Sequence, residues 1–159
     1  MSAQKDLTYW LSEYSRYHVH PLNKQIHWVC VPVIMMTLLG LLWSLPVPGA
    51  VGGHSVALNW SSILVLVSIV FYLRLSLPLA IGMGLITAAM LASFGPIEAI
   101  QSGLVWQVSL VVFVLAWIGQ FIGHKIEGRK PAFFQDLQFL LVGPIWILAD
   151  VYKRLGIPL

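Results

Sequence analysis

Three of the five histidines in this chain lie within ten residues of one another, directly before the first long apolar run. They are His18, His20 and His27, in the stretch RYHVHPLNKQIHW, and His124 follows a later apolar run. Neutral imidazole nitrogens suit iron, zinc, copper and nickel. A single histidine at a membrane boundary is more often a packing residue than a ligand. Four histidines at one boundary indicate a metal site as an alternative to packing.

Charged side chains near these histidines could serve the same chemistry. Glu127 and Asp136 could add an oxygen ligand or orient an imidazole ring from behind it. Lys125, Arg129 and Lys130 follow His124 closely. These basic residues either keep their loop on the cytoplasmic side of a membrane or bind an anionic head group.

Membrane helices are the elements that must position these residues. A chain of 159 residues that is 58% hydrophobic and 9% charged cannot hide its apolar surface in one soluble core. We therefore predict an all-α, polytopic membrane helix bundle with four to five spans, forming a single domain over residues 1–159, and no nucleic-acid partner. The apolar windows, compared with the about 20 residues that span a bilayer, cover roughly 27–45, 61–75, 77–94, 104–123 and, less cleanly, 137–152.

The placement of Lys and Arg predicts the orientation of the bundle. Basic residues precede the first window, follow the second at Arg74 and follow the fourth, whereas the two intervening loops have none. This alternation predicts a cytoplasmic N-terminus, in the inner membrane of a bacterial cell or in the endoplasmic reticulum of a eukaryote. It places His54 on the opposite side from the other four histidines. Lys153 and Arg154 break the alternation if the fifth segment crosses, so four versus five crossings stays open.

The segment before the first window is predicted to form an amphipathic helix on the membrane surface. Pro21 should end this helix, because the residue before a proline is pushed away from helical angles, and Asn23 is then the expected N-cap of the first spanning helix. An interfacial helix and hinge over residues 1–22 would let His18 and His27 point into a shared space before the bundle of residues 23–159. The stripe at three- and four-residue steps consists of Leu7, Trp10, Leu11, Tyr14, Tyr17 and His18.

Small residues recur every fourth position in the third window, at Ala80, Gly84, Ala88 and Ala92. Such a face lets another helix approach closely. We interpret it as a packing surface, within the chain or between copies in a homo-oligomer.

Two separated motifs resemble those of a known enzyme family. The pattern Tyr17-His18…Pro21…Asn23…His27…Pro32, followed by QFIGHKIEGRKPAFFQDL at residues 120–137, resembles the 2-hydroxy fatty acid dioxygenase family of α-oxidation over nearly the whole chain. The resemblance implies a membrane-embedded, Fe(II)-dependent enzyme that uses O2 to shorten a long-chain 2-hydroxy fatty acid by one carbon.

The resemblance also implies roles for individual residues. His18, His27 and His124 match the recurrent histidines of the family and are expected to be catalytic and to bind Fe(2+). His20 falls at a variable position of the motif, and Glu127 lies in a segment one residue shorter than the family's. We retain His20 as the least secure ligand and Glu127 as a residue that orients the ligands.

The expected chemistry fits these groups. A 2-hydroxy acid can chelate iron through its carboxylate and hydroxyl while O2 takes another position, and cleavage of the C1–C2 bond would then release C1 in oxidised form. The acyl tail would stay in a hydrophobic groove while its polar end reaches the metal and a basic residue on the cytoplasmic face. The residues expected to bind the substrate are Asn23, Lys24, Arg129 and Lys130.

Two other classes of protein are compatible with the same residues. A haem- or metal-binding electron carrier would clamp one iron between two of the histidines. A small membrane transporter or scaffold would use the histidines only for packing or pH sensing, and its transport would depend on Glu98 or Arg74 as membrane-adjacent charges.

Overall fold

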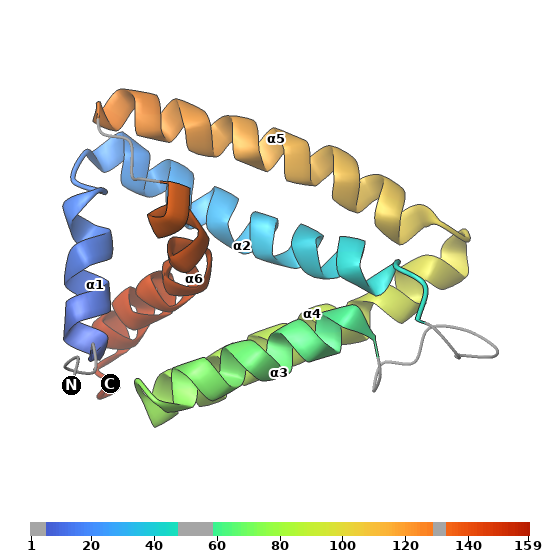
Figure 1. Ribbon diagram of the computed structural model, residues 1–159, viewed down its shortest axis with the longest axis horizontal. Helices are drawn as coiled ribbons and strands as arrows, with labels where there is room; N and C mark the ends of the chain where they lie inside the picture. The colour runs from blue at the N-terminus through green and yellow to red at the C-terminus, as the bar shows by residue number, and fades with distance from the viewer. Residues whose placement is uncertain (1–5, 48–58, 129–132) are drawn as a thin grey trace.

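The computed structural model describes residues 6–47, 59–128 and 133–159, with side chains in the last of these segments described from residue 139 onward. All regular structure within these residues is helical, so the predicted all-α class is confirmed (Figure 1). The helices are α1 (Leu7–Arg16), α2 (Pro21–Trp43), α3 (Trp60–Leu73), α4 (Leu77–Ile100), α5 (Leu104–Glu127) and α6 (Phe133–Leu155).

Three of these helices are long and apolar enough to cross a membrane, namely α2, α4 and α5, with 23, 24 and 24 residues. The apolar helix α3 has 14 residues and is only roughly 21 Å long at 1.5 Å per residue. That length is shorter than a hydrocarbon layer of about 30 Å. The described residues therefore show a membrane protein with three helices of spanning length, and the fourth and fifth crossings stay predictions.

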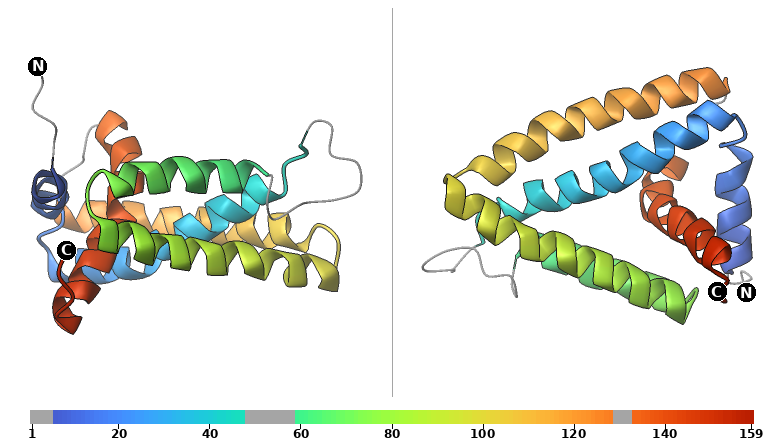
Figure 2. Two further views of the ribbon diagram at one scale, coloured as in Figure 1. Left: turned by 90° about the horizontal axis from the view of Figure 1, so that it is seen from below. Right: turned by 180° about the vertical axis from the view of Figure 1, so that it is seen from behind.

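Four of the helices form two pairs, and α6 lies between the pairs. Helix α2 packs along α5, and α3 packs along α4. Helix α6 contacts α1, α2 and α4, and so links the two pairs (Figures 1 and 2). Helix α1 crosses the end of the molecule at which α2 begins and α5 ends (Figure 1). This end therefore collects the histidine-bearing segments.

The predicted stripe on the N-terminal helix is confirmed, and it packs on protein. Tyr14 is buried, and its ring lies 5.2 Å from the rings of both Phe139 and Trp146 of α6. The indole N–H of Trp146 donates a hydrogen bond of 2.9 Å to the Ser15 hydroxyl. Helix α6 runs without a break through Pro144, and at Gly143 an added Cβ would lie 3.0 Å from the Tyr14 hydroxyl. Gly143 has no side chain and therefore leaves room for the Tyr14 ring next to α6.

The hinge between α1 and α2 exists, but its details differ from the sequence-based expectation. Helix α1 ends at Arg16 with Tyr17 as its C-cap, so Pro21 does not end it. Pro21 instead begins α2, where a proline fits because its fixed φ is helical and its missing N–H has no helical partner. The predicted N-cap Asn23 was wrong. His20 caps the helix, and its Nδ1 accepts a hydrogen bond of 3.2 Å from the Leu22 N–H.

The small-residue face of α4 is covered only in its first half. Ala80 is buried and Gly84 lies against Ile69 of α3, whereas Ala88 and Ala92 are exposed. The tightest approach on α4 is at the neighbouring Gly82, where an added Cβ would collide with the Tyr152 hydroxyl of α6. Contact between copies of the chain through this face stays a prediction.

Candidate metal centre

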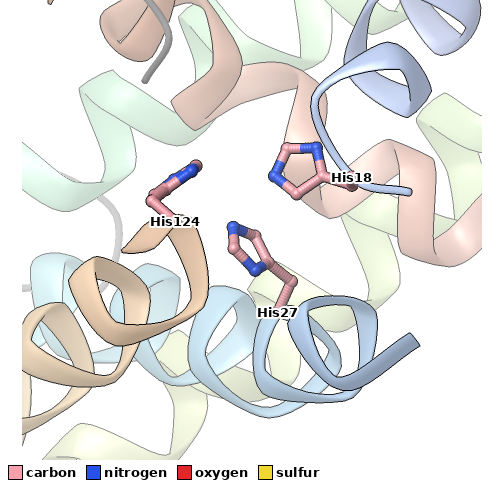
Figure 3. Close-up of side chains that lie close together, drawn as sticks. All are labelled: His18, His27 and His124. Carbon is pink, nitrogen blue, oxygen red and sulfur yellow. The ribbon is translucent and has the colours of Figure 1, made fainter. Parts of the chain in front are cut away.

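Three of the predicted histidines meet in one cluster at the end of the molecule where α1 crosses. Each of His18, His27 and His124 offers a nitrogen, and these three atoms all lie within 4.8 Å of one another. Figure 3 shows the three rings turned toward a common space, one from the α1–α2 turn, one from α2 and one from the last turn of α5. Segments more than 100 residues apart in the sequence therefore build one potential ligand set.

Backbone carbonyls orient two of the rings. His18 Nδ1 lies 2.7 Å from the Tyr14 carbonyl oxygen, and His27 Nδ1 lies 2.9 Å from the Asn23 carbonyl oxygen. Because a carbonyl oxygen only accepts, each Nδ1 must carry the proton, which leaves Nε2 as the nitrogen with a free lone pair. A hydrogen bond from the ring nitrogen that does not bind the metal commonly orients a metal-binding histidine.

Burial keeps the first of these histidines neutral. His18 is 1% exposed, and the Tyr14 ring stacks on it with the ring centres 4.1 Å apart. Desolvation by burial lowers the pKa of His18 to about 4, so its imidazole is uncharged at neutral pH. Its Nε2 is buried and has no hydrogen-bond partner among the described residues. A metal cation would satisfy that lone pair, so these residues fit a metal site.

Glu127 holds the segments that carry the histidines together. One of its carboxylate oxygens accepts a hydrogen bond of 2.9 Å from the Val19 N–H, and the other accepts bonds of 3.0 Å from the His20 N–H and 2.8 Å from the Asn23 side-chain amide. The end of α5 is thereby tied to the turn between α1 and α2. Glu127 thus positions the backbone segments that carry the histidines, and its predicted role as an oxygen ligand or as a group that orients a ring stays a prediction.

Helices α2 and α5 approach each other closely beside the hydrogen bonds of Glu127. Asn23 is fully buried, and its Oδ1 lies against Gly123 of α5, where an added Cβ would collide with it. Gly123 is therefore needed for the spacing of α2 and α5 beside His27 and His124.

The other predicted site residues lie elsewhere. His20 is exposed, lies outside the three-histidine group and caps α2. Lys24 is exposed on the first turn of α2. The predictions for Arg129, Lys130 and His54, and the one for the side chain of Asp136, fall outside the described parts of the structure.

An apolar cavity that is open at one side lies against the histidine cluster. It runs between α2, α3, α4, α5 and α6, with Tyr14 of α1 also in its lining, and along α2 it extends from His27 to Leu39. Most of its lining is aliphatic or aromatic. The polar side chains other than histidine that line it are Tyr14, Ser68, Tyr72, Thr87 and Gln120.

Two lining residues were missed by sequence reasoning as parts of the site. Tyr14 stacks on His18 and supplies the carbonyl that orients it. Gln120 lines the cavity from the same helix as His124. Gln120 precedes His124 by four residues of α5, a spacing that puts two helical side chains on one face, so this periodicity was the signal that could have found it.

These features define an all-helical membrane protein with a buried three-histidine site opening on a long apolar cavity. The model of the Mpo1-like family, described as 2-hydroxy-palmitic acid dioxygenase Mpo1-like, matches residues 4–155, and the chain belongs to this family. The 2-hydroxy-palmitic acid dioxygenase MPO1 of Saccharomyces cerevisiae is 29% identical over 153 residues, which cover 95% of this chain and 82% of the yeast protein. No solved structure matches the chain. The resemblance found in the histidine motifs is thus confirmed at the level of the family.

Proposed function

We propose that this protein is an Fe(II)-dependent dioxygenase that uses O2 to shorten long-chain 2-hydroxy fatty acids by one carbon. The observation that carries the proposal is the position of three converging imidazoles against an apolar cavity. Membership of the Mpo1-like family supports the reaction class.

The residues that would hold the iron are His18, His27 and His124. Bound iron would supply the redox chemistry that O2 requires, because amino-acid side chains alone do not activate it. The chain's own contribution is a set of three imidazoles, of which the His18 and His27 rings are buried and fixed by the Tyr14 and Asn23 carbonyls. Surrounding apolar side chains would exclude bulk water from the reacting end of the substrate.

The cavity would hold the acyl tail. Its lining on α2 extends from His27 to Leu39, a separation of twelve residues, which is roughly 18 Å at 1.5 Å per residue. An extended chain advances roughly 1.2 Å per bond, so this length corresponds to roughly 15 bonds. The cavity therefore suits a long-chain acid whose polar end is at the histidines.

The carboxylate would lie at the histidine end of the cavity. We assign its attraction to Lys24, Arg129 and Lys130, on the cytoplasmic side of the bacterial inner membrane or the endoplasmic reticulum. Asn23 is assigned a supporting role, because its amide N–H donates to Glu127 and its Oδ1 faces Gly123.

Metal analysis and product analysis on the purified protein test the proposal. After anaerobic reconstitution with Fe(II) in detergent, the protein should hold stoichiometric iron and convert 2-hydroxyhexadecanoate, in an O2-dependent reaction, to a product one carbon shorter. A His18/His27/His124 triple alanine variant should do neither. A Soret band would instead indicate the haem carrier, and wild-type protein without iron or product would return the histidines to packing or pH sensing in a transporter or scaffold.

A further inference from the structure

The side-chain carbonyl of Gln120 lies in the cavity wall outside the histidine cluster and has no hydrogen-bond partner among the residues that the structure describes. Gln120 of α5 is 5% exposed, and its side-chain carbonyl oxygen Oε1 is buried without a hydrogen bond to any described residue. Leaving a buried acceptor unpaired costs free energy, so native structures rarely do so without a reason. The wall position of Gln120 points to a ligand as its partner.

Three hydroxyl groups in the same wall already have hydrogen-bond partners. The hydroxyls of Ser68, Tyr72 and Thr87 donate hydrogen bonds of 2.8 to 2.9 Å to the backbone carbonyls of Leu64, Leu141 and Met83 respectively. Because their hydroxyl protons are donated to the backbone, these side chains have no proton left to donate to a ligand. The Gln120 carbonyl differs from them because it remains available as an acceptor.

The position of Gln120 along α5 indicates which carbons of a bound fatty acid would lie next to it. It precedes His124 by four residues, so it lies on the same face and roughly 6 Å deeper along the helix at 1.5 Å per residue. Both side chains line the cavity. An acid with its carboxylate end at the histidines and its tail in the cavity must therefore pass Gln120 with the carbons next to the carboxylate.

We propose that Gln120 Oε1 accepts a hydrogen bond from the 2-hydroxyl group of the substrate, and that this contact distinguishes 2-hydroxy acids from unsubstituted fatty acids. The inference rests on the proposed function for the orientation of the acid. An unsubstituted acid would fill the same apolar cavity but would leave Oε1 buried and unpaired. Sites built to bind a substrate hydroxyl reject analogues that lack it for this reason.

Binding to the metal-free protein tests the inference without relying on catalysis. Displacement of a fluorescent fatty acid from detergent-solubilised protein gives dissociation constants for 2-hydroxyhexadecanoate, hexadecanoate and 2-methoxyhexadecanoate, the last of which has no hydroxyl proton to donate. The wild type should bind the 2-hydroxy acid about tenfold more tightly than the other two, as expected for one well-formed hydrogen bond. Gln120→Leu should abolish this preference and retain the affinity for hexadecanoate.

Two further variants separate a specific contact from a general defect. Gln107→Leu changes an exposed glutamine on the same helix and should keep the wild-type preference. Gln120→Met preserves the length of the side chain without its acceptor, and it replaces Gln120→Leu if that variant no longer binds hexadecanoate.

Each outcome decides between the inference and the proposed function. Equal affinity of the wild type for the three acids would mean that water satisfies Oε1 and would overturn the inference. A preference that survives in both Gln120 variants would overturn it too, even if 2-hydroxyhexadecanoate is turned over. A preference lost only at Gln120, in a protein that shows no O2-dependent product, would retain the binding contact and reject the dioxygenase.

Discussion

Two of the three cluster histidines, His18 and His27, share one feature at the residue scale, which is a buried ring whose orientation is fixed by a backbone carbonyl. His18 and His27 are 1% and 2% exposed, and carbonyl oxygens hold their Nδ1 protons. A charged imidazolium would be costly in such a place. The sequence could predict these residues, because histidines are rare in an apolar chain and occur at helix ends.

Substitution of single histidines should separate ligands from neighbours. His18→Ala, His27→Ala and His124→Ala should each lose bound iron and turnover of 2-hydroxyhexadecanoate, because no other described side chain can replace the missing nitrogen. His20→Ala should keep its iron and lose about 1 kcal/mol of stability, because it removes the N-cap of α2. Iron content and product formation at matched amounts of monodisperse protein measure both effects. Wild-type iron in His27→Ala or His124→Ala would contradict the site.

The hydrogen-bond partners of Glu127 could not be predicted from the sequence. Its partners lie more than 100 residues away, in the turn before α2, and only the fold brings them together. The same fold decides that Asn23 binds Glu127 while His20 serves as the cap, since both residue types can cap a helix and the start of α2 is set by Pro21.

Removal of the Glu127 carboxylate should loosen the site without removing a ligand. Glu127→Ala leaves two backbone N–H groups and the Asn23 amide without their acceptor, and it should cost about 1–3 kcal/mol of stability and about 10–100-fold in iron affinity. Glu127→Gln keeps one acceptor oxygen and should lie between this variant and the wild type. Thermal unfolding and iron titration report the two effects. Glu13→Gln, which removes only a surface ion pair with Arg16, is the control and should change little.

At the scale of elements, the sequence could predict the helices but only part of how they meet. The period of the N-terminal stripe and the apolar windows follow from local side-chain pattern, and both appear in the structure. Close approaches depend on glycines whose neighbours come from another helix. Gly82 and Gly123 are such points, and neither was assigned a packing role from the sequence.

The contact at Gly123 provides a test of how the spacing of α2 and α5 controls the site. Gly123→Ala would drive a methyl group into Asn23 Oδ1, and forcing the helices apart should cost about 1–3 kcal/mol and weaken iron binding. Gly95→Ala in α4 meets nothing within 4 Å and should stabilise the helix by about 0.4–1 kcal/mol with iron binding unchanged. Thermal unfolding with and without iron measures both variants. Equal behaviour of the two would show that the spacing at Gly123 does not control the site.

At the scale of the whole molecule, composition identified a membrane protein, because no soluble core could bury this fraction of apolar residues. Five apolar windows correspond to three helices of spanning length among the described residues, and α3, with 14 residues, is the apolar helix that is shorter than a hydrocarbon layer. The cavity could not be predicted at all, because its wall is built from residues of all six described helices. Its depth depends on how they pack and not on any one segment.

The deep end of the cavity should set the preferred length of the acyl chain. Leu39 is 2% exposed, is the deepest lining residue of α2 and packs in one apolar cluster with Trp43, Leu91 and Phe94. Leu39→Ala removes three carbon atoms from this end, so the optimum among 2-hydroxy acids should move about two or three carbons longer. Leu39→Val should cause a smaller shift with less loss of stability, whereas Leu66→Ala, on the exposed face of α3, should leave the profile unchanged. Turnover measured across a series of 2-hydroxy acids gives the profile, and an optimum that stays fixed in both Leu39 variants would mean that the tail does not reach this end.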